Sequence, residues 1–214
     1  MSTGRIAGVV LAAGRGTRFG APKQFQLLGG RRLVDRAVAL LHPVCRDIVV
    51  VLPADVVWDG VAVHASVTGG SSRTESLRKA VSALTSPELE IIIVHDAIRP
   101  LAGPDVVGRL VEAIDAGADA AIPGWEPPDT IKKILPDGSL EHVGREGFLI
   151  VQGPSAFRAT TLRAMFAAFD EIPTEETIGI QQFGGRVVAV RGDKWSHHLV
   201  DPPDLATMER LVGP

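Results

Sequence analysis

Two glycines and two basic side chains lie close together near the start of the chain. The segment Leu11–Gln24 reads LAAGRGTRFGAPKQ and contains Gly14, Gly16, Arg18 and Lys23. Small residues let the backbone approach a ligand, and successive N–H groups in such a turn form an anion-binding concavity. Fixed cations beside it stabilise charge on a phosphorus group under attack. The segment predicts a triphosphate site, and the alternative is a glycine turn flanked by solvated basic residues.

The spacing of these glycines excludes two common nucleotide-binding loops. A dinucleotide-binding loop needs G-x-G-x-x-G with a helix starting at once, whereas Pro22 delays any helix here. The P-loop pattern G-x-x-x-x-G-K-[ST] is absent from the sequence. The Pro-Lys-Gln after the glycines therefore indicates a different kind of loop.

A second glycine-rich segment, Thr68–Ser76, reads TGGSSRTES. Its two adjacent glycines are expected to leave backbone groups free to hydrogen-bond the edge of a planar base. Ser76 falls in the first turn of the next predicted helix, where hydroxyl and N–H groups suit anions. The alternative is a glycine turn followed by an ordinary helix cap, supplied by Ser72 or Thr74.

A third segment, His95–Pro100 (HDAIRP), adds an acid to the predicted phosphate loops. Asp96 follows a predicted strand, where a carboxylate is placed to hold Mg²⁺ or a sugar hydroxyl. Asp129 is a second acid at a strand edge, so Asp96 and Asp129 are candidates to flank one metal ion. Arg99 either pairs with Asp96 or binds a phosphate. His95 is expected to be buried and to satisfy backbone groups rather than to act in catalysis.

Strand-like and helical segments alternate along the first half of the chain and would position these loops. Apolar runs predict strands at 6–11, 48–52, 61–67, 90–94 and 118–122, and helical spacing predicts helices at 32–41, 74–84 and 104–116. Strands rich in Val and Ile, interleaved with helices, indicate an α/β fold with a parallel sheet covered on both faces. Ligands of such sheets bind outside the carboxyl ends of the strands. The three segments are therefore expected to meet there.

The region from about 125 to 152 has a different pattern. Extended segments at 130–135 and 140–143 flank a Pro-Asp-Gly turn, and 148–152 is extended too, which predicts a β-arm at about 131–152. Such an arm is marginal alone and is expected to pack on something, such as a second subunit. Helices are predicted at 160–169, 175–183 and 203–211, the last capped by Asp201 or a neighbour, and a strand at 186–190. We expect one domain, 1–214.

Composition limits the classes of partner. The 214 residues are 45% hydrophobic and 22% charged, with a formal net charge of −3, which is typical of a globular protein and favours neither nucleic acid nor membrane as a partner. No apolar run approaches the roughly 20 residues that a membrane span requires. The N-terminus lacks the features of a secretory signal, so we expect a cytoplasmic protein. The single cysteine, Cys45, is expected to be a packed thiol.

In this order, the segments resemble the 2-C-methyl-D-erythritol 4-phosphate cytidylyltransferase family of the non-mevalonate isoprenoid pathway. The matching segments are Leu11–Gln24, Gly69–Ser76, Val94–Pro100, Asp129–Lys132 and Pro202–Leu205. The resemblance covers nearly the whole chain, and A-A-G-x-G-x-R with P-K-Q, followed by H-D-x-x-R-P, is its most specific part. It implies a Rossmann-like nucleotidyltransferase fold, mostly parallel with helices on both faces and a protruding β-arm.

The resemblance also implies substrates, a cofactor and residue roles. The substrates would be CTP and a small polyol phosphate, the cofactor Mg²⁺, and the assembly a homodimer through the arm. Arg18 and Lys23 would be catalytic and stabilise the α-phosphate during in-line attack. The implied nucleotide-binding residues are Ala12, Ala13, Gly14, Gly16, Gly70, Ser71 and Ser76. The implied substrate-binding residues are Asp96, Arg99, Arg145, Thr174 and His198, of which Arg145 would reach into the partner's site.

Two positions depart from the family's pattern on the substrate side. Gly153 stands where the family has a threonine, and His198 where it has a lysine. A histidine that is mostly neutral at pH 7 should bind phosphate less well than a permanent cation. The acceptor is therefore either methylerythritol phosphate held differently or another polyol phosphate, such as ribitol 5-phosphate.

Two further alternatives remain. A sugar-1-phosphate or molybdopterin nucleotidyltransferase is disfavoured because Pro-Lys follows the glycines too soon for the sugar enzymes and because the Val94–Pro100 motif fits the cytidylyltransferases. A non-catalytic nucleotide-binding paralogue is disfavoured because Arg18, Lys23 and Asp96 are all present.

Overall fold

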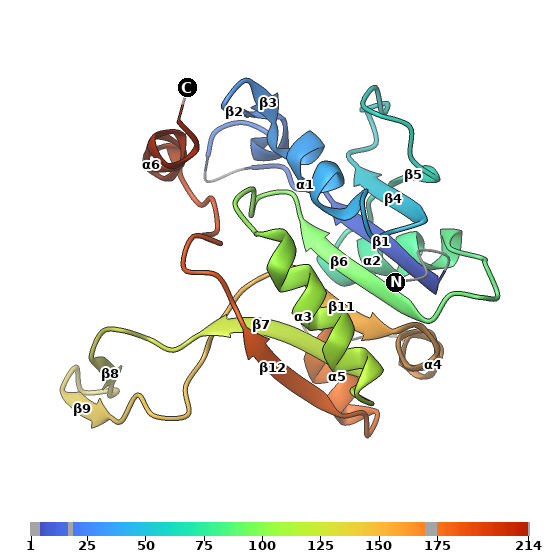
Figure 1. The fold of residues 1–214 in the computed structure, drawn as a ribbon. Helices are drawn as coiled ribbons and strands as arrows, with labels where there is room; N and C mark the ends of the chain where they lie inside the picture. The colour runs from blue at the N-terminus through green and yellow to red at the C-terminus, as the bar shows by residue number, and fades with distance from the viewer. Residues whose placement is uncertain (1–4, 17–18, 170–174, 214) are drawn as a thin grey trace.

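A mixed sheet of eight strands runs through the part of the chain that the structure, a computed structural model, describes: residues 5–16, 19–169 and 175–213 (Figure 1). In spatial order its strands are β10 (Ile150–Val151), β7 (Ala120–Trp125), β11 (Ser155–Arg158), β6 (Ile91–Asp96), β1 (Ile6–Leu11), β4 (Asp47–Leu52) and β5 (Ala65–Thr68), and β12 (Val187–Arg191) pairs with β7. The helices are α1 (Leu33–Leu41), α2 (Arg73–Ala83), α3 (Pro104–Asp115), α4 (Ala159–Ala168), α5 (Glu176–Gln182) and α6 (Pro202–Val212).

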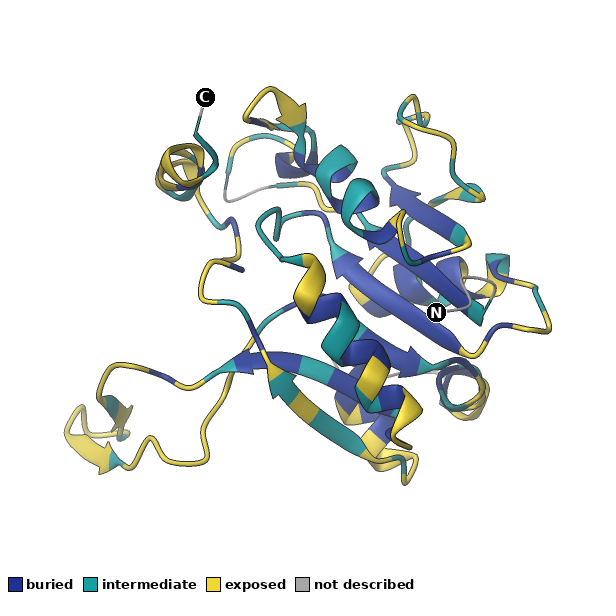
Figure 2. Cartoon of the chain, in the orientation of Figure 1, coloured by how far each residue is buried: buried dark blue, intermediate teal, exposed yellow. Residues whose placement is uncertain are grey.

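Three neighbouring strands, β6, β1 and β4, run parallel and are buried on both faces. β1 pairs in parallel with β4 and β6, and β4 pairs in parallel with β5. One face packs on α1 and α3, and the other on α2, α4 and α5. Figure 2 shows the buried residues concentrated in these central strands. The predicted α/β fold, mostly parallel with helices on both faces, is confirmed.

One central strand was not predicted from the sequence. β11 lies between β6 and β7 and pairs antiparallel with both, so the sheet is mixed rather than wholly parallel. Its sequence, SAFR, has only two apolar residues, Ala156 and Phe157, and both are fully buried. So short a segment has no periodicity that distinguishes it from a loop.

Most predicted boundaries agree with the structure to within about two residues. There are two exceptions: the strand predicted at 118–122 continues to Trp125, and the strand predicted at 61–67 is confined to Ala65–Thr68, after a loop. A short helical turn, η2 (Lys23–Phe25), and a small hairpin, β2 (Leu27–Leu28) and β3 (Arg31–Arg32), were also not predicted. Of the candidate caps of α2, Ser72 accepts the backbone N–H of Glu75.

The predicted β-arm is present. β8 (Ile131–Ile134) and β9 (Leu140–Val143) form a separate two-stranded sheet that projects from the body of the molecule (Figure 1). The extended segment predicted at 148–152 is reduced to β10, which pairs antiparallel with β7 in the main sheet. Ile134 and Leu140 are 75% and 64% exposed. That a second subunit covers them stays a prediction.

Two smaller expectations, the cap of α6 and the packed cysteine, are confirmed. Asp201 caps α6 in a capping box with Asp204. Cys45 is buried, and burial raises the pKa of its thiol to about 12, as expected for a packed neutral cysteine. Among the described residues, no helix is long and apolar enough to cross a membrane.

The central position of β11 gives a stability prediction. Phe157 is fully buried, so Phe157→Ala should lower the free energy of unfolding by about 3–5 kcal/mol in urea titrations, through lost burial and a residual cavity. Phe183→Ala is the matched control, because Phe183 is 40% exposed, and we expect a loss below about 1.5 kcal/mol. Equal losses for the two variants would contradict the placement of β11 in the core.

Candidate functional site

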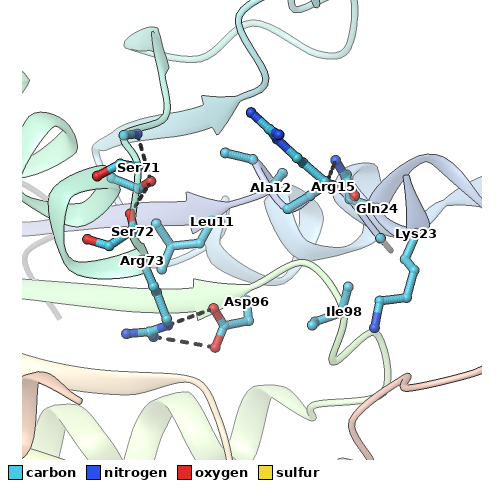
Figure 3. A pocket seen from close by; sticks show the side chains of 15 residues that line it. Leu11, Ala12, Arg15, Lys23, Gln24, Ser71, Ser72, Arg73, Asp96 and Ile98 are labelled. Carbon is cyan, nitrogen blue, oxygen red and sulfur yellow. Dashed lines mark hydrogen bonds and ion pairs between the residues drawn. The ribbon is translucent and has the colours of Figure 1, made fainter. Parts of the chain in front are cut away.

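A cavity of about 660 Å³ opens at the carboxyl ends of β1 and β6. The three segments singled out in the sequence meet there, as expected for a parallel sheet. Their lining residues are Leu11, Ala12, Ala13, Gly14, Arg15, Gly16, Lys23 and Gln24 from the first, Gly70, Ser71, Ser72, Arg73 and Ser76 from the second, and Asp96 and Ile98 from the third (Figure 3). Every nucleotide-binding residue implied by the resemblance therefore lies around one cavity.

The first glycine loop is held in shape by the chain itself. Gly16 has φ +64°, and a Cβ there would lie 1.8 Å from the carbonyl oxygen of Ala21, so only glycine fits. The buried Gln24 donates its Nε2 hydrogen to the carbonyl oxygen of Gly14 at 2.9 Å. A Cβ on Gly14 would meet nothing within 4 Å. The fold therefore requires glycine at position 16, whereas position 14 opens onto the cavity.

Lys23 borders the cavity but also ties down another part of the chain. Its side chain is buried, and its Nζ donates to the carbonyl oxygens of Leu199 and Val200 at 2.8 and 3.3 Å. Figure 3 shows the Lys23 side chain ending beside Ile98 and pointing away from Arg15. Lys23 thus links the glycine loop to the segment before α6, which the sequence did not indicate.

The first loop contains two further basic residues, Arg15 and Arg18, of which the structure describes only Arg15. Arg18, predicted to be catalytic, lies outside the described residues. Arg15 is exposed and lines the cavity, and it was not among the predicted site residues. Its position between Gly14 and Gly16 could have indicated a cation beside the predicted phosphate site.

The second glycine loop uses its own polar groups. The N–H of Gly69 donates to the carbonyl oxygen of Leu52 at 2.9 Å, and the N–H of Gly70 donates to Oγ of Ser76 at 2.9 Å. Ser76 Oγ in turn donates to the carbonyl oxygen of Ser72 at 2.8 Å. Both glycine N–H groups are therefore engaged by the chain, contrary to the expectation that they are free, and Ser76 builds the loop that lines the cavity.

Arg73, at the start of α2, is the main site residue that sequence reasoning missed. Its Nε and Nη2 donate to the carboxylate of Asp96 at 3.3 and 3.4 Å, and its Nη1 donates to the carboxylate of Glu176. Burial alone lowers the pKa of Arg73, but the charges of Asp96 and Glu176 more than offset it, so the net pKa is raised. The available signal was an arginine in the first turn of a helix that follows a glycine loop.

A second cavity of about 300 Å³ adjoins the first, because Arg73 and Asp96 line both. Arg99 lines the second cavity and hydrogen-bonds the carbonyl oxygens of Ser196 at 3.0 Å and Val151 at 3.4 Å, so its side chain is held by backbone groups. Burial, together with Arg73, lowers the pKa of Arg99, although Asp96 opposes this.

The departure at position 153 falls in the second cavity. Gly153 is buried, and a Cβ there would lie 3.2 Å from Cδ of Arg99. A threonine at this position would therefore press on the arginine. His198, the other departure, is exposed and lines neither cavity.

Other predicted site residues lie elsewhere. Asp129 is exposed, just before β8, and lines neither cavity. The structure therefore does not bring Asp129 to the cavities that Asp96 lines. Arg145 is exposed in the arm and donates to the carbonyl oxygen of Pro128 at 2.6 Å. Thr174 lies outside the described residues.

The acidic residues bear on the predicted metal site. Within residues 5–16, 19–169 and 175–213, no group of three or more His, Cys, Asp or Glu side chains is arranged to hold a metal ion. Mg²⁺ is commonly bound by one or two carboxylates plus substrate phosphates rather than by a cage of protein ligands. A single carboxylate at the edge of the cavity, Asp96, fits that mode.

His95 is buried, as predicted, but one of its two ring nitrogens, Nδ1, bonds no backbone group of the described chain. It is 1% exposed, and its Nδ1 has no hydrogen-bond partner among the described residues. Burial lowers its pKa to about 4, an effect that Asp96 opposes and Arg99 reinforces. The imidazole is therefore neutral at pH 7.

Comparison with known proteins shows which family the chain belongs to. The family model for 2-C-methyl-D-erythritol 4-phosphate cytidylyltransferase matches residues 6–213. The chain belongs to this family. A cytidylyltransferase of that name from Saccharopolyspora erythraea is 35% identical over 222 residues, covering 97% of this chain and 99% of the relative. Another, from Nocardia farcinica, is 35% identical over 221 residues, covering 98% and 94%.

A solved structure agrees with the cytidylyltransferase assignment. The 2-C-methyl-D-erythritol 4-phosphate cytidylyltransferase from Thermus thermophilus superposes with a TM-score of 0.83 at 27% identity, covering 97% of this chain and 98% of that one. The resemblance inferred from the motifs is therefore confirmed over nearly the whole length, and so is the nucleotidyltransferase fold.

The buried His95 predicts a pH dependence of stability. Its pKa falls from 6.5 to about 4 on folding, so between these values the unfolded chain binds a proton that the folded protein excludes. The free energy of unfolding is therefore unaffected by this group above pH 6.5 and falls as the pH is lowered toward 4. Between pH 7 and pH 5 the expected loss is roughly 2 kcal/mol. His95→Gln should remove this slope in urea unfolding measured at several pH values.

The control for this prediction is His142→Gln, because His142 is exposed in the arm. The control should keep the wild-type slope. If His95→Gln also keeps it, His95 is not the group that loses its proton on folding.

Proposed function

We propose that the chain transfers CMP from CTP to 2-C-methyl-D-erythritol 4-phosphate with release of pyrophosphate. The observation that carries the proposal is that the three motif segments converge on one cavity at the carboxyl ends of β1 and β6. The relatives that share these segments along the whole chain bear the name of this activity. The reaction would serve the synthesis of isoprenoid precursors by the non-mevalonate pathway.

The larger cavity takes the nucleotide. Gly14 offers an open backbone to the triphosphate, and Ala12 and Ala13 add small residues beside it. Lys23, with Arg18 from the same loop and the exposed Arg15, supplies positive charge. These groups act by positioning and charge stabilisation, since in-line phosphoryl chemistry needs no covalent enzyme intermediate.

A divalent ion completes this charge balance. Asp96 would hold Mg²⁺ together with oxygen atoms of the triphosphate, whereas Asp129 lines neither cavity and is left out of this site. When bound, the ion neutralises negative charge on the phosphate groups. The chain's own part is to present Asp96 at the boundary of the two cavities.

The smaller cavity takes the acceptor. Asp96, Ser155 and Thr177 offer oxygen atoms for the hydroxyl groups of a polyol, and Arg99 offers a cation for its phosphate. Thr174, Arg145 of a second subunit and His198 are proposed to complete this side. Gly153 and the exposed His198 favour one alternative, a cytidylyltransferase for another polyol phosphate such as ribitol 5-phosphate.

Pyrophosphate release tests the function directly. Each of the four common nucleoside triphosphates is combined with a panel of polyol phosphates and sugar 1-phosphates. We expect turnover with CTP and methylerythritol phosphate. Turnover only with ribitol 5-phosphate would select the alternative, and turnover only with UTP and a sugar 1-phosphate would overturn both.

The same assay tests the two predicted catalytic residues. Arg18→Ala and Lys23→Ala should each lower turnover about a hundredfold or more, if each cation contributes about 3 kcal/mol to the transition state. Arg186→Ala removes an exposed cation just before β12, at the opposite edge of the sheet, and should leave turnover unchanged. A loss below about fivefold for Arg18 or Lys23 would refute a catalytic role.

The β-arm is proposed to form a homodimer by contact with a second copy of the chain. The cytoplasmic location expected from the sequence is proposed as well, and the CTP-dependent reaction fits it. A lone two-stranded sheet is marginal in water, yet this arm exposes Ile134 and Leu140. Burying them against a second copy would stabilise the arm and bring Arg145 to the partner.

Sedimentation velocity tests the dimer. Ile134→Ser combined with Leu140→Ser should convert a dimer to a monomer, because the apolar contact is lost. Val57→Ser is the matched control, since Val57 is 86% exposed but lies far from the arm in sequence. A monomeric wild type, or a dimer that survives the double substitution, would contradict this assembly.

A further inference from the structure

Three charged side chains that line the cavities are linked to one another by ion pairs. Glu176 begins α5, Arg73 begins α2, and Asp96 ends β6. Arg73 donates to both carboxylates and so joins three elements that are distant in sequence. Figure 3 shows the paired Arg73 and Asp96 side chains among the residues that line the larger cavity.

The contacts on the two sides of Arg73 are unequal. The bonds to Asp96 are long, at 3.3 and 3.4 Å, whereas both oxygens of Glu176 approach the Nη1 nitrogen closely. Glu176 is also much the more buried partner, with a side chain 2% exposed against 30% for Asp96. Charge-assisted hydrogen bonds strengthen as they shorten and lose water. Glu176 therefore dominates the placement of the guanidinium group.

The position of Glu176 relative to the cavities is distinctive. Arg73 and Asp96 line both cavities, whereas Glu176 lines only the smaller one. Arg99 is bound to backbone carbonyl groups, so the hydrogen bonds that orient Asp96 come from Arg73. A change at Glu176 would thus reach Asp96 through Arg73.

We propose that Glu176 is a positioning residue of the transfer reaction, which holds Arg73 so that Arg73 fixes the Asp96 carboxylate between nucleotide and acceptor. The proposal rests on the function proposed above. Glu176 does not touch the reacting phosphorus, so its removal acts on geometry rather than on the chemical groups themselves. It should affect the acceptor and the transfer step more than the binding of CTP.

Steady-state kinetics with CTP and methylerythritol phosphate give the first test. Glu176→Gln keeps the shape but removes the charge, and we expect kcat to fall at least about tenfold and the acceptor KM to rise, because misplacement by about 1 Å has effects of this size or more. The Kd for CTP should change less than about threefold. Glu176→Asp keeps the charge and should recover part of the loss. Unchanged kcat, or a loss confined to CTP binding, would overturn the proposal.

A matched control removes a different ion pair. Asp115 receives two hydrogen bonds from Arg5 at the end of α3, and both residues lie outside the two cavities. Asp115→Asn should leave kcat and both KM values unchanged. An equal loss in this variant would mean that any broken ion pair impairs the enzyme.

A double variant separates positioning from simple stabilisation. Glu176→Gln alone leaves a partly buried arginine with one partner, which lowers the melting temperature, whereas Arg73→Met with Glu176→Gln removes both charges and should regain stability. Under the proposal the double variant regains melting temperature but not kcat. If kcat returns with stability, Glu176 has only a structural role.

A crystal structure of the Glu176→Gln variant tests the proposal even if the assigned reaction is wrong. We expect the Arg73 guanidinium to shift by about 1 Å or more and to lose its hydrogen bonds to Asp96. An unchanged Arg73–Asp96 pair would overturn the positioning role. An inactive wild type with the expected shift would instead overturn the proposed function alone.

Discussion

The parallel pairing of β1 with its neighbours is the constraint on which the site depends. The register places Leu11, the last residue of β1, opposite Asp96 at the end of β6 and opposite Val51 in β4. The carboxyl ends of neighbouring parallel strands lie at the same edge of the sheet, so the loops that leave them lie close together. The glycine loop and the acid are therefore neighbours because β1 and β6 are hydrogen-bonded in this register along their whole length. A slip of one residue in this register would separate them.

The loops at that edge are shaped before any ligand arrives. Gln24 holds the carbonyl group of Gly14, Ser76 accepts the N–H of Gly70, and Lys23 is tied to the segment before α6. Groups that a sequence motif suggests as ligand contacts thus serve first as loop supports. Preorganised loops lower the entropy that is lost when a flexible triphosphate binds. The same side chains both support a loop and line the cavity, so the residue types of a motif can reflect either role.

The smaller cavity is built differently, mostly from the second half of the chain. The antiparallel β11 inserts between β6 and β7, and the segment that leads into it brings Gly153 against Arg99. Helix α5 then delivers Glu176 to Arg73. This side consists of contacts between elements rather than of one compact motif. A glycine in place of the family's threonine at position 153 can therefore alter the smaller cavity while the two glycine loops stay intact.

The sequence by itself determined the alternation of strands and helices, the β-arm, the order of the three loops and their convergence at one edge of the sheet. These follow from local periodicity and from glycine and proline positions, which act within a few residues. Only the tertiary structure decided that Arg73 pairs with Glu176, that Lys23 binds the carbonyl group of Leu199, and that β11 is a central strand. The first two contacts join residues 103 and 176 positions apart, and β11 is too short to have a pattern. No local signal encodes such contacts, because they exist only once the packed elements bring the side chains together.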